Sequence, residues 1–595
     1  MIRTGRRLAD VLLGTAFRTA PWMTVACLAM GTIAAASSVL YSIGYRVMID
    51  GAIAYASGRI ALGAVLVSVL FTLAWLLGVL GANAGSVLTD RVNLQIGVRV
   101  ARLAATLPTL EHFEHPERLG RLEQLTRNRR TLAGAPRQLI SLFGQGVRAI
   151  ATVVLLATVY APILVVPLLA LAPALSDRRA ATVTQRSGDS LAEDRRLLND
   201  LFAMATSASS ASELRTYDIA EELTRRHDEL TERVRRRSVR AAMISAGWEA
   251  VGWIVFAAGL VAAIVVLVLR AAHGHVSPGQ VVMSISLMRR AQRQISSSTD
   301  TAGTFNTSQA AARQLLWLED HERELRPAGP GRPVPVRLRE GIRLDGVVFA
   351  YPGGGAPVLD RIDLELPAGR SVAVVGENGA GKTTLVKLLC AMYRPTQGQI
   401  LIDGVDLAEL DLTDWRGRLS AAFQDYVRFQ FTLGESVGVG DLARIGERDV
   451  VRSAMARASA DALEERLPDG LATSIGSRYT GGRELSGGEW QRVALARGLM
   501  RAGPLLVVLD EPTASLDARA ESALFGRYAQ AAREAGEADG TITLLISHRF
   551  STVRSADLIV VLERGRVAEV GSHEALLAAG GPYAELYELQ ARAYA

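Results

Sequence analysis

Long stretches without charged residues dominate the first half of the sequence. Ala20–Tyr45 and Ile60–Ala84 contain no charged side chain, and each is long enough to cross a bilayer hydrocarbon core of about 30 Å. Leu139–Ser176 contains one charge, Arg148, and is interrupted at Ala161-Pro162. We interpret this third stretch as two membrane spans joined by a tight turn.

Two more apolar stretches follow, Ala250–Leu269 and one that starts near Pro278 and is uncharged as far as Met288. Buried core helices of a soluble protein are the alternative, but runs of this length that recur along the chain favour membrane helices. The sequence therefore predicts an all-α membrane domain of six helices, at approximately residues 20–45, 60–84, 139–160, 162–176, 246–269 and 278–300.

The loops between these spans differ in charge, which predicts their orientation. Gly85–Gln138 and Asp177–Ser245 are long and rich in arginine, whereas the other connections are short and carry few basic residues. Basic loops stay on the cytoplasmic side. We therefore expect a multi-pass protein of the cytoplasmic membrane with both termini in the cytoplasm. Basic residues other than Lys382 and Lys387 are arginines, which suggests a bacterial genome rich in GC.

A change of pattern divides the 595 residues into domains. Residues 1–318 form the predicted membrane domain, residues 319–341 are rich in Pro, Gly and charge and predict a linker, and residues 342–595 alternate short strands and helices. We predict a multidomain membrane protein in which an α/β domain follows the membrane helices. The two cysteines lie in unrelated segments, so no disulfide framework is indicated.

A glycine-rich loop in this α/β domain fits G-x-x-x-x-G-K-[ST] between an apolar strand and a helix, which predicts a P-loop ATPase domain. Its backbone N–H groups and the helix N-terminus suit phosphate oxygens. Lys382 is expected to reach the β- and γ-phosphates of ATP, and Thr383 to ligate Mg²⁺. The expected ATP-binding residues of the loop are Gly376, Glu377, Asn378, Gly379, Ala380, Gly381, Lys382, Thr383 and Thr384.

A second apolar strand, Leu505–Leu509, ends in two carboxylates, Asp510 and Glu511. Asp510 suits a Mg²⁺ site, and Glu511 is placed to position or deprotonate the attacking water. A structural role for Glu511, as a cap of the following turn, is the alternative. His548 follows a third strand and is expected to contact the γ-phosphate, although a lone histidine after a strand is usually structural.

Together with Leu485-Ser486-Gly487-Gly488, these motifs resemble the ATP-binding cassette (ABC) transporter family over essentially the whole chain. The resemblance implies that Tyr351 stacks on adenine and that Gln424 senses Mg²⁺, takes part in catalysis and couples to the membrane domain. It also implies that Ser486, Gly487 and Gly488 clamp the γ-phosphate bound by the opposite subunit, with Asp517 at the dimer interface. Short coupling helices are expected near Leu125–Thr131 and Asn199–Ala208. Glu489 departs from the family's usual glutamine, with little expected effect.

The predicted function is ATP-driven export across the bacterial membrane by a half-transporter that pairs with a second copy or with a related chain. His112–Glu117 and Gln424–Arg428 resemble exporters of peptide antibiotics, so a peptide or another amphipathic metabolite, drug or lipid is the expected cargo. An importer of the same fold, for instance of an iron chelate, is one alternative. A soluble ATPase that remodels DNA or ribosomes is another, which the membrane spans disfavour. The expected partners are lipid, cargo and a second subunit, with no nucleic acid.

Two arginines of the sixth span give the one prediction about a cargo site. Arg289 and Arg293 lie on one helical face with Ser286. If the span begins near Pro278, Arg289 lies about 17 Å along it, inside the bilayer, where a charge should face protein or water. The alternative is that both side chains extend to the inner membrane surface.

Overall fold

The computed structural model describes residues 2–169, 171–207, 210–325, 329, 331–511, 536–547 and 553–594. The chain forms two compact units. The first comprises Met1–Ala104 and Arg121–Glu319, and the second comprises Ala105–Gly120 and Asp320–Ala595. We describe each unit by itself.

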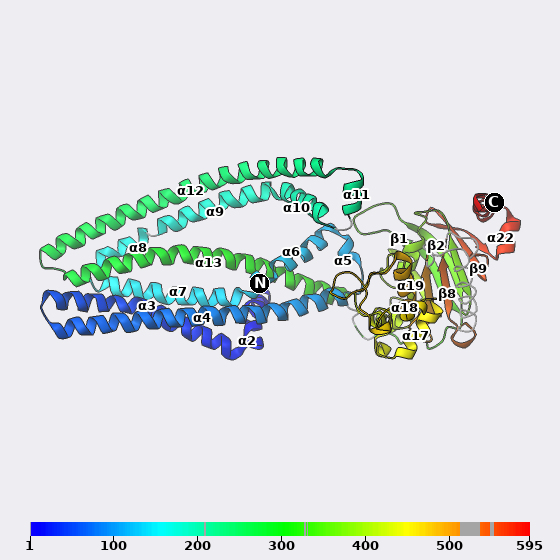
Figure 1. Cartoon of the computed structure of the whole chain (residues 1–595), viewed down its shortest axis with the longest axis horizontal. Helices are drawn as coiled ribbons and strands as arrows, with labels where there is room; N and C mark the ends of the chain where they lie inside the picture. The colour runs from blue at the N-terminus through cyan, green and yellow to red at the C-terminus, as the bar shows by residue number, and fades with distance from the viewer. Residues whose placement is uncertain are drawn as a thin grey trace. The chain divides into compact units, whose positions relative to one another are not determined.

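Long helices build the first unit, and Figure 1 shows the longest of them running side by side. A 3₁₀ turn at Ala161–Leu164 lies at the predicted turn between the third and fourth spans. The α-helices are α1 (Ile2–Ala9), α2 (Thr15–Thr19), α3 (Pro21–Ile53), α4 (Ser57–Thr106), α6 (Pro116–Ala133), α7 (Ala135–Ala157), α8 (Val165–Leu169), α9 (Leu171–Ser190), α10 (Ala192–Thr206), α11 (Ala211–Thr216), α12 (Ala220–Ala272) and α13 (Pro278–Leu325).

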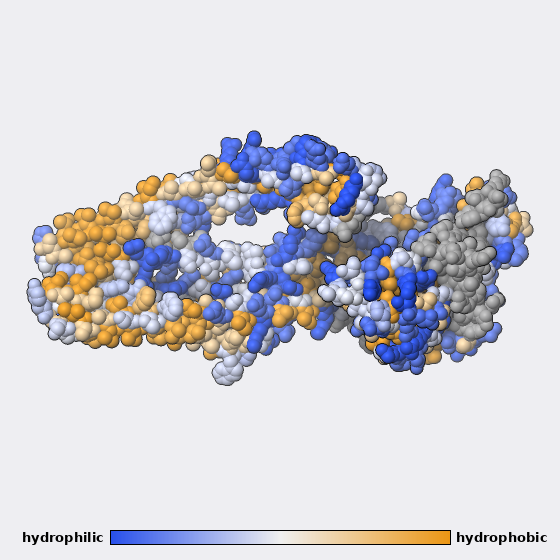
Figure 2. All heavy atoms as spheres, viewed as in Figure 1, coloured by the Kyte–Doolittle hydropathy of each residue, from blue (hydrophilic) through white to orange (hydrophobic). Residues whose placement is uncertain are grey.

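Within the described residues, five stretches are long and apolar enough to cross a membrane, namely α3, α4, α7, the run Ala161–Ser190 and α12. Their outer faces expose large apolar side chains such as Phe71 (54% exposed) and Trp75 (62%), and Figure 2 shows these faces as a broad apolar band over α3, α4 and α12. The predicted sixth span, α13, begins at Pro278 as expected, but does not meet this criterion. Its uncharged part is short because Arg289 and Arg290 follow it.

The helices continue well beyond the uncharged stretches from which they were predicted. α12 begins at Ala220, far before the predicted start near residue 246. Its polar half carries ion pairs one turn apart, such as Arg226 with Glu222 (2.7 Å) and Arg235 with Glu232 (2.7 Å). Such pairs support a solvated helix. α13 likewise continues to Leu325, so the first residues of the predicted linker are helical.

Polar contacts fix α13 against other helices of the first unit. The Asp50 carboxylate accepts hydrogen bonds from the Ser277 hydroxyl (2.8 Å) and the Gly279 N–H (2.9 Å) at the start of α13. A Cβ at Gly279 would lie 2.5 Å from the Arg46 carbonyl oxygen, so this close approach requires glycine. Further along, the buried Gln145 amide of α7 donates to the Ser297 hydroxyl (3.2 Å).

The second unit is an α/β domain with two sheets among its described residues. An antiparallel sheet has the order β2-β1-β4-β5, and a second sheet, parallel except for the β9–β10 pair, has the order β10-β9-β3-β8-β7-β6. The strands are β1 (Gly341–Phe349), β2 (Leu359–Pro367), β3 (Ser371–Val375), β4 (Gln397–Ile402), β5 (Val405–Asp406), β6 (Leu419–Ala422), β7 (Leu506–Asp510), β8 (Ile542–Ile546), β9 (Leu558–Glu563) and β10 (Arg566–Gly571).

Strands β3, β7 and β8 are almost wholly buried, as their continuous apolar sequences predict. Because β3 and β7 are both paired in parallel with β8, their carboxyl ends lie at the same edge of the sheet. The helices of the unit are α5 (Glu111–Glu114), α14 (Lys382–Leu389), α15 (Leu412–Gly417), α16 (Leu433–Gly438), α17 (Arg448–Arg457), α18 (Ala462–Arg466), α19 (Gly487–Gly498), α22 (His573–Ala579) and α23 (Pro582–Tyr594).

A segment from the membrane half of the sequence, Ala105–Gly120, folds with the ATPase unit. The Leu110 N–H donates to the Met392 carbonyl oxygen (3.1 Å), and Arg416 donates to that of Pro108. Lys387 lies 3.7 Å from the Glu114 carboxylate. This corrects one prediction: the segment that docks on the ATPase unit precedes Leu125–Thr131, which lies inside the continuous helix α6. The other predicted coupling helix, Asn199–Ala208, stays a prediction.

Candidate functional site

The loop between β3 and α14 has the backbone that its glycines allow. Gly376, Gly379 and Gly381 have φ values of 150°, 85° and 102°, which residues with a Cβ rarely adopt. Space is also restricted: a Cβ on Gly376 would lie 2.2 Å from the Leu562 carbonyl oxygen, and one on Gly381 would lie 2.6 Å from a Leu359 methyl carbon. Glycine at these positions therefore keeps the loop around the start of α14, where its N–H groups can face phosphate.

Lys382 curls back over this loop. Its ammonium donates to the carbonyl oxygens of Gly376 (2.8 Å) and Glu377 (2.9 Å). Burial lowers the pKa of Lys382, and the carboxylates of Glu511 and Asp510 oppose the shift. The ammonium is thus held by carbonyl groups that an incoming phosphate can replace.

A cavity of about 660 Å³ opens beside the loop. It brings together residues that the sequence placed far apart, including Gln424 after β6 and the two carboxylates at the end of β7. The lining residues are Val358, Asn378, Gly379, Gly381, Lys382, Thr383, Thr384, Gln424, Asp510, Glu511 and Ile546. Of these, Val358 and Ile546 were not among the predicted site residues, because an apolar side chain at a strand end gives no sequence signal for binding.

The two carboxylates at the end of β7 differ in their surroundings. Asp510 is 2% exposed, and burial, with the neighbouring Glu511 charge, raises its pKa to about 6, against the effect of Lys382. Because burial makes an unpaired negative charge unfavourable, this carboxylate is suited to bind a cation. Glu511 instead has φ of 46°, an uncommon backbone conformation for a residue with a side chain.

Hydrogen bonds hold Glu511 in this conformation. The Gln424 amide donates to its carboxylate (2.9 Å), the Gln491 amide donates to its carbonyl oxygen (3.2 Å), and its own N–H donates to the Ile546 carbonyl oxygen (3.0 Å). Uncommon backbone conformations that neighbours enforce in this way occur preferentially at functional sites. Gln491 is a further residue that the sequence prediction did not include, although it lies just after the Ser-Gly-Gly motif.

Tyr351 lies beside the same loop. Its hydroxyl is 3.1 Å from the Thr384 hydroxyl, and its ring packs edge-on against Phe349 (5.1 Å between ring centres) and Tyr393 (5.5 Å). Its ring is half-buried. An aromatic face at this position can accept a nucleotide base, and adenine stacking by Tyr351 stays a prediction.

The Ser-Gly-Gly motif starts helix α19 through a capping box. The Glu489 carboxylate accepts from the Ser486 N–H (2.8 Å), while the Ser486 hydroxyl accepts from the Glu489 N–H (3.4 Å). Burial acts to raise the pKa of Glu489, but these bonds and Arg466 hold it below its ordinary value. Glutamine also serves in a capping box, which explains why glutamate can stand here. Ser486, Gly487 and Gly488 are not among the described residues that line the cavity beside the glycine-rich loop.

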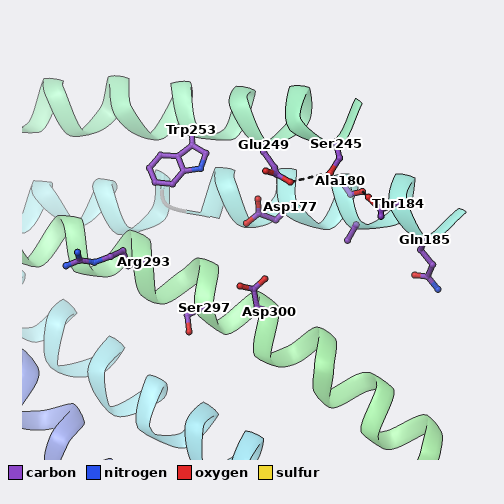
Figure 3. Close-up of a pocket in the computed structure, with 11 residues that line it drawn as sticks. Asp177, Ala180, Thr184, Gln185, Ser245, Glu249, Trp253, Arg293, Ser297 and Asp300 are labelled. Atoms are coloured by element: carbon purple, nitrogen blue, oxygen red, sulfur yellow. Dashed lines mark hydrogen bonds between the residues drawn. The ribbon is translucent and has the colours of Figure 1, made fainter. Parts of the chain in front are cut away.

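Two predicted site residues, His548 and Asp517, lie outside the described residues. The two predicted cargo residues, Arg289 and Arg293, lie in the first unit, and one of them lines a cavity there. Arg293 lines a cavity of about 1000 Å³ between α9, α12 and α13 (Figure 3). Arg289 is not among the described residues that line it.

A phosphate-binding loop, a buried aspartate and a held glutamate at one sheet edge define a P-loop ATPase domain, here in one chain with membrane-type helices. Residues 359–514 match the family model of ABC transporters. The structure resembles that of a bacterial Atm1-family ABC exporter with ATP bound, with a TM-score of 0.70, 25% sequence identity and coverage of 96% of this chain and 99% of that one.

Two curated relatives are ATP-dependent lipid A-core flippases. The protein of Chromobacterium violaceum is 36% identical over 391 residues, which cover 65% of this chain and 64% of that protein. The protein of Nitrosococcus oceani is 37% identical over 369 residues, which cover 62% of this chain and 59% of that protein. The chain thus matches about three fifths of each relative. The chain resembles ABC transporters of the exporter type, in which a helical membrane domain is fused to one ATPase domain.

Proposed function

We propose that this chain is half of an ATP-driven exporter that moves an amphipathic cargo across the bacterial cytoplasmic membrane. The observation that carries the proposal is the joining of apolar helices to an ATPase site whose groups converge on one cavity. The names of its relatives, flippases and an exporter, support export over the import alternative. A peptide cargo stays a prediction, because the relatives described above are named for a lipid cargo.

In this proposal, each residue of the ATP site has a distinct task. Lys382 releases its carbonyl partners and binds the β- and γ-phosphates, while the N–H groups around Gly379 and Gly381 bind the remaining phosphate oxygens. The donor set of the Thr383 hydroxyl and the Asp510 carboxylate fits Mg²⁺, which would neutralise phosphate charge when bound. Glu511, held by Gln424, orients the attacking water and accepts its proton.

Two copies of the chain would complete the sites. Ser486–Gly488 start a helix yet do not belong to the described lining of their own chain's cavity. We propose that they close over the phosphates bound by a second copy. ATP would then stabilise the closed pair, and the energy for cargo release would come from the difference in ATP affinity between closed and open states.

A mixing experiment tests this arrangement. Copies with Lys382→Ala and copies with Ser486→Arg are each expected to be inactive alone. In a mixed pair, one site combines both defects and the other combines an intact loop with an intact Ser-Gly-Gly motif. ATP hydrolysis should therefore reappear in nanodiscs that hold one copy of each. If mixing restores no activity while wild-type pairs hydrolyse ATP, the shared-site proposal is wrong. Cargo accumulation in inside-out vesicles tests the direction.

A further inference from the structure

The cavity of the first unit is built by regularly spaced positions on three helices. Ser245, Glu249 and Trp253 of α12 are four residues apart, so they lie on one helix face. Asp177, Ala180, Ala181 and Thr184 share a face of α9, and Arg293, Ser297 and Asp300 line the cavity from α13. In Figure 3 the side chains of Asp177, Glu249 and Asp300 converge from these three helices.

Close packing fixes the two helices that carry Asp177 and Glu249. A Cβ on Gly252 of α12 would lie 2.8 Å from the Pro173 Cα and 2.7 Å from the Ser176 hydroxyl oxygen of α9. The third wall is fixed separately, because Gln145 of α7 donates to the hydroxyl of Ser297 (3.2 Å). The carboxylates therefore sit on packed helices and not on loops, which suits a preorganised site.

The charges that face this cavity are mainly negative. Among the described residues, the one hydrogen bond to the three carboxylates is that of the Ser245 hydroxyl to Glu249 (3.3 Å), and none of the three is in an ion pair. Figure 3 draws Arg293 pointing away from them. Arg290 packs over the Tyr41 ring (4.1 Å) and donates to the Ser38 carbonyl oxygen. Three carboxylates against one guanidinium leave a net negative charge.

Apolar surface lies next to these charges. Asp177 directly follows the apolar stretch that ends at Ser176, and Glu249 directly precedes the uncharged stretch Ala250–Leu269. Trp253 presents an exposed indole to the same cavity. Indole faces attract cations, and the same helix pair already shows this contact between Arg179 and Trp248 (5.1 Å).

We propose that this cavity binds an amphiphile with a positively charged head, such as an ammonium, guanidinium or phosphonium group. The head would lie among Asp177, Glu249 and Asp300 and against Trp253, while the apolar part follows the adjoining apolar stretches. Arg289 and Arg293 alone would favour an acidic cargo, and the three carboxylates reverse that preference. The inference rests on the proposed export function, whose cargo class it specifies.

Tetraphenylphosphonium and tetraphenylborate are the probes, since they match in size and shape and differ in the sign of their charge. Binding to the full-length protein in nanodiscs is measured by equilibrium dialysis without ATP, with protein-free nanodiscs as the blank. Tetraphenylphosphonium should bind at least about tenfold more tightly than tetraphenylborate, because the three carboxylates attract a cation and repel an anion. Combining Asp177→Asn, Glu249→Gln and Asp300→Asn should remove that preference, and Arg293→Gln should strengthen cation binding.

A matched control carries the same loss of charge outside the cavity: Glu193→Gln, Asp228→Asn and Glu229→Gln on α10 and α12. These changes should leave the cation preference intact, and basal ATP hydrolysis should continue in every variant. Equal binding of both probes, or no saturable binding of either, would overturn the inference. The proposed function would still stand in that case if the protein hydrolyses ATP. Absence of ATP hydrolysis in the wild-type protein would instead count against the proposed function.

Discussion

The ATP cavity and the membrane-half cavity are built from the sequence in opposite ways. Most of the ATP cavity comes from short motifs with fixed residue types. The run Asn378–Thr384 alone supplies six of the eleven described residues that line it. The other cavity takes several residues from each of three helices, and Asp177, Glu249 and Asp300 meet there although each lies more than fifty residues from the next in sequence. We expect the identity of each residue to matter in the first cavity and the sum of charges to matter in the second. Single changes should therefore act very differently in the two.

The largest effect is expected from Glu511→Gln. Glutamine keeps the size of the side chain and can still meet Gln424, but it cannot accept a proton from water. Turnover should fall on the order of 10²-fold or more, as positioned acid–base groups contribute 10²–10⁴, while ATP affinity stays nearly unchanged. Steady-state hydrolysis and nucleotide binding on the same preparation measure both quantities.

Lys382→Ala is the matched control, because it should weaken ATP binding itself by removing a phosphate contact. No one-residue change in the membrane-half cavity should approach either effect. If Glu511→Gln hydrolyses ATP near the wild-type rate, Glu511 has no catalytic task and the contrast between the two cavities loses its main support.

A smaller effect, on thermal stability, is expected at Glu489. Any side chain there that can accept the hydrogen bond of the capping box should preserve stability. Glu489→Ala removes the capping box with Ser486 and the ion pair with Arg466, and loss of such a cap costs about 1 kcal/mol. Glu489→Gln keeps the cap. The thermal midpoint of the full chain should fall by a few degrees for alanine, by about 2–4 °C per kcal/mol, and stay within about a degree for glutamine. Equal midpoints would show that the capping box carries no stability.

The sequence pattern indicates the candidate ATP site more directly than the membrane half, for a physical reason. Backbone conformation or charge determines which residue type can stand at Gly376, Lys382 and Asp510. These positions can therefore be recognised from the sequence pattern. The membrane spans were found by the absence of charge, and therefore their ends were misplaced: α12 continues as a solvated helix held by ion pairs such as Arg226–Glu222. Asp177 and Asp300 gave no signal, because only helix packing brings them together.

The docking segment Ala105–Gly120 also escaped prediction, because its contacts pair single residues with distant backbone groups. Leu110 meets Met392, and Arg416 meets Pro108. Neither pair follows a spacing that a sequence pattern could show. The segment thus belongs to the ATPase unit by its contacts and to the membrane half by its place in the sequence. Its contacts can therefore be tested separately from either cavity.

His112 of this segment should give the smallest effect, a pH dependence of stability. It is 3% exposed, and burial lowers its pKa, with His321 and Arg118 adding to the shift and the Thr109 backbone and Glu111 opposing it. Between the lowered value and about 6.5, the unfolded chain binds a proton that the folded chain does not, so stability falls as pH decreases through this window. From pH 7.5 to 5.5 the wild-type thermal midpoint should drop by about 1–3 °C more than that of His112→Asn. The exposed His275 provides the control, since His275→Asn should keep the wild-type pH dependence. An identical pH dependence in His112→Asn would mean that the buried imidazole does not titrate with unfolding, and that this docking contact acts through packing alone.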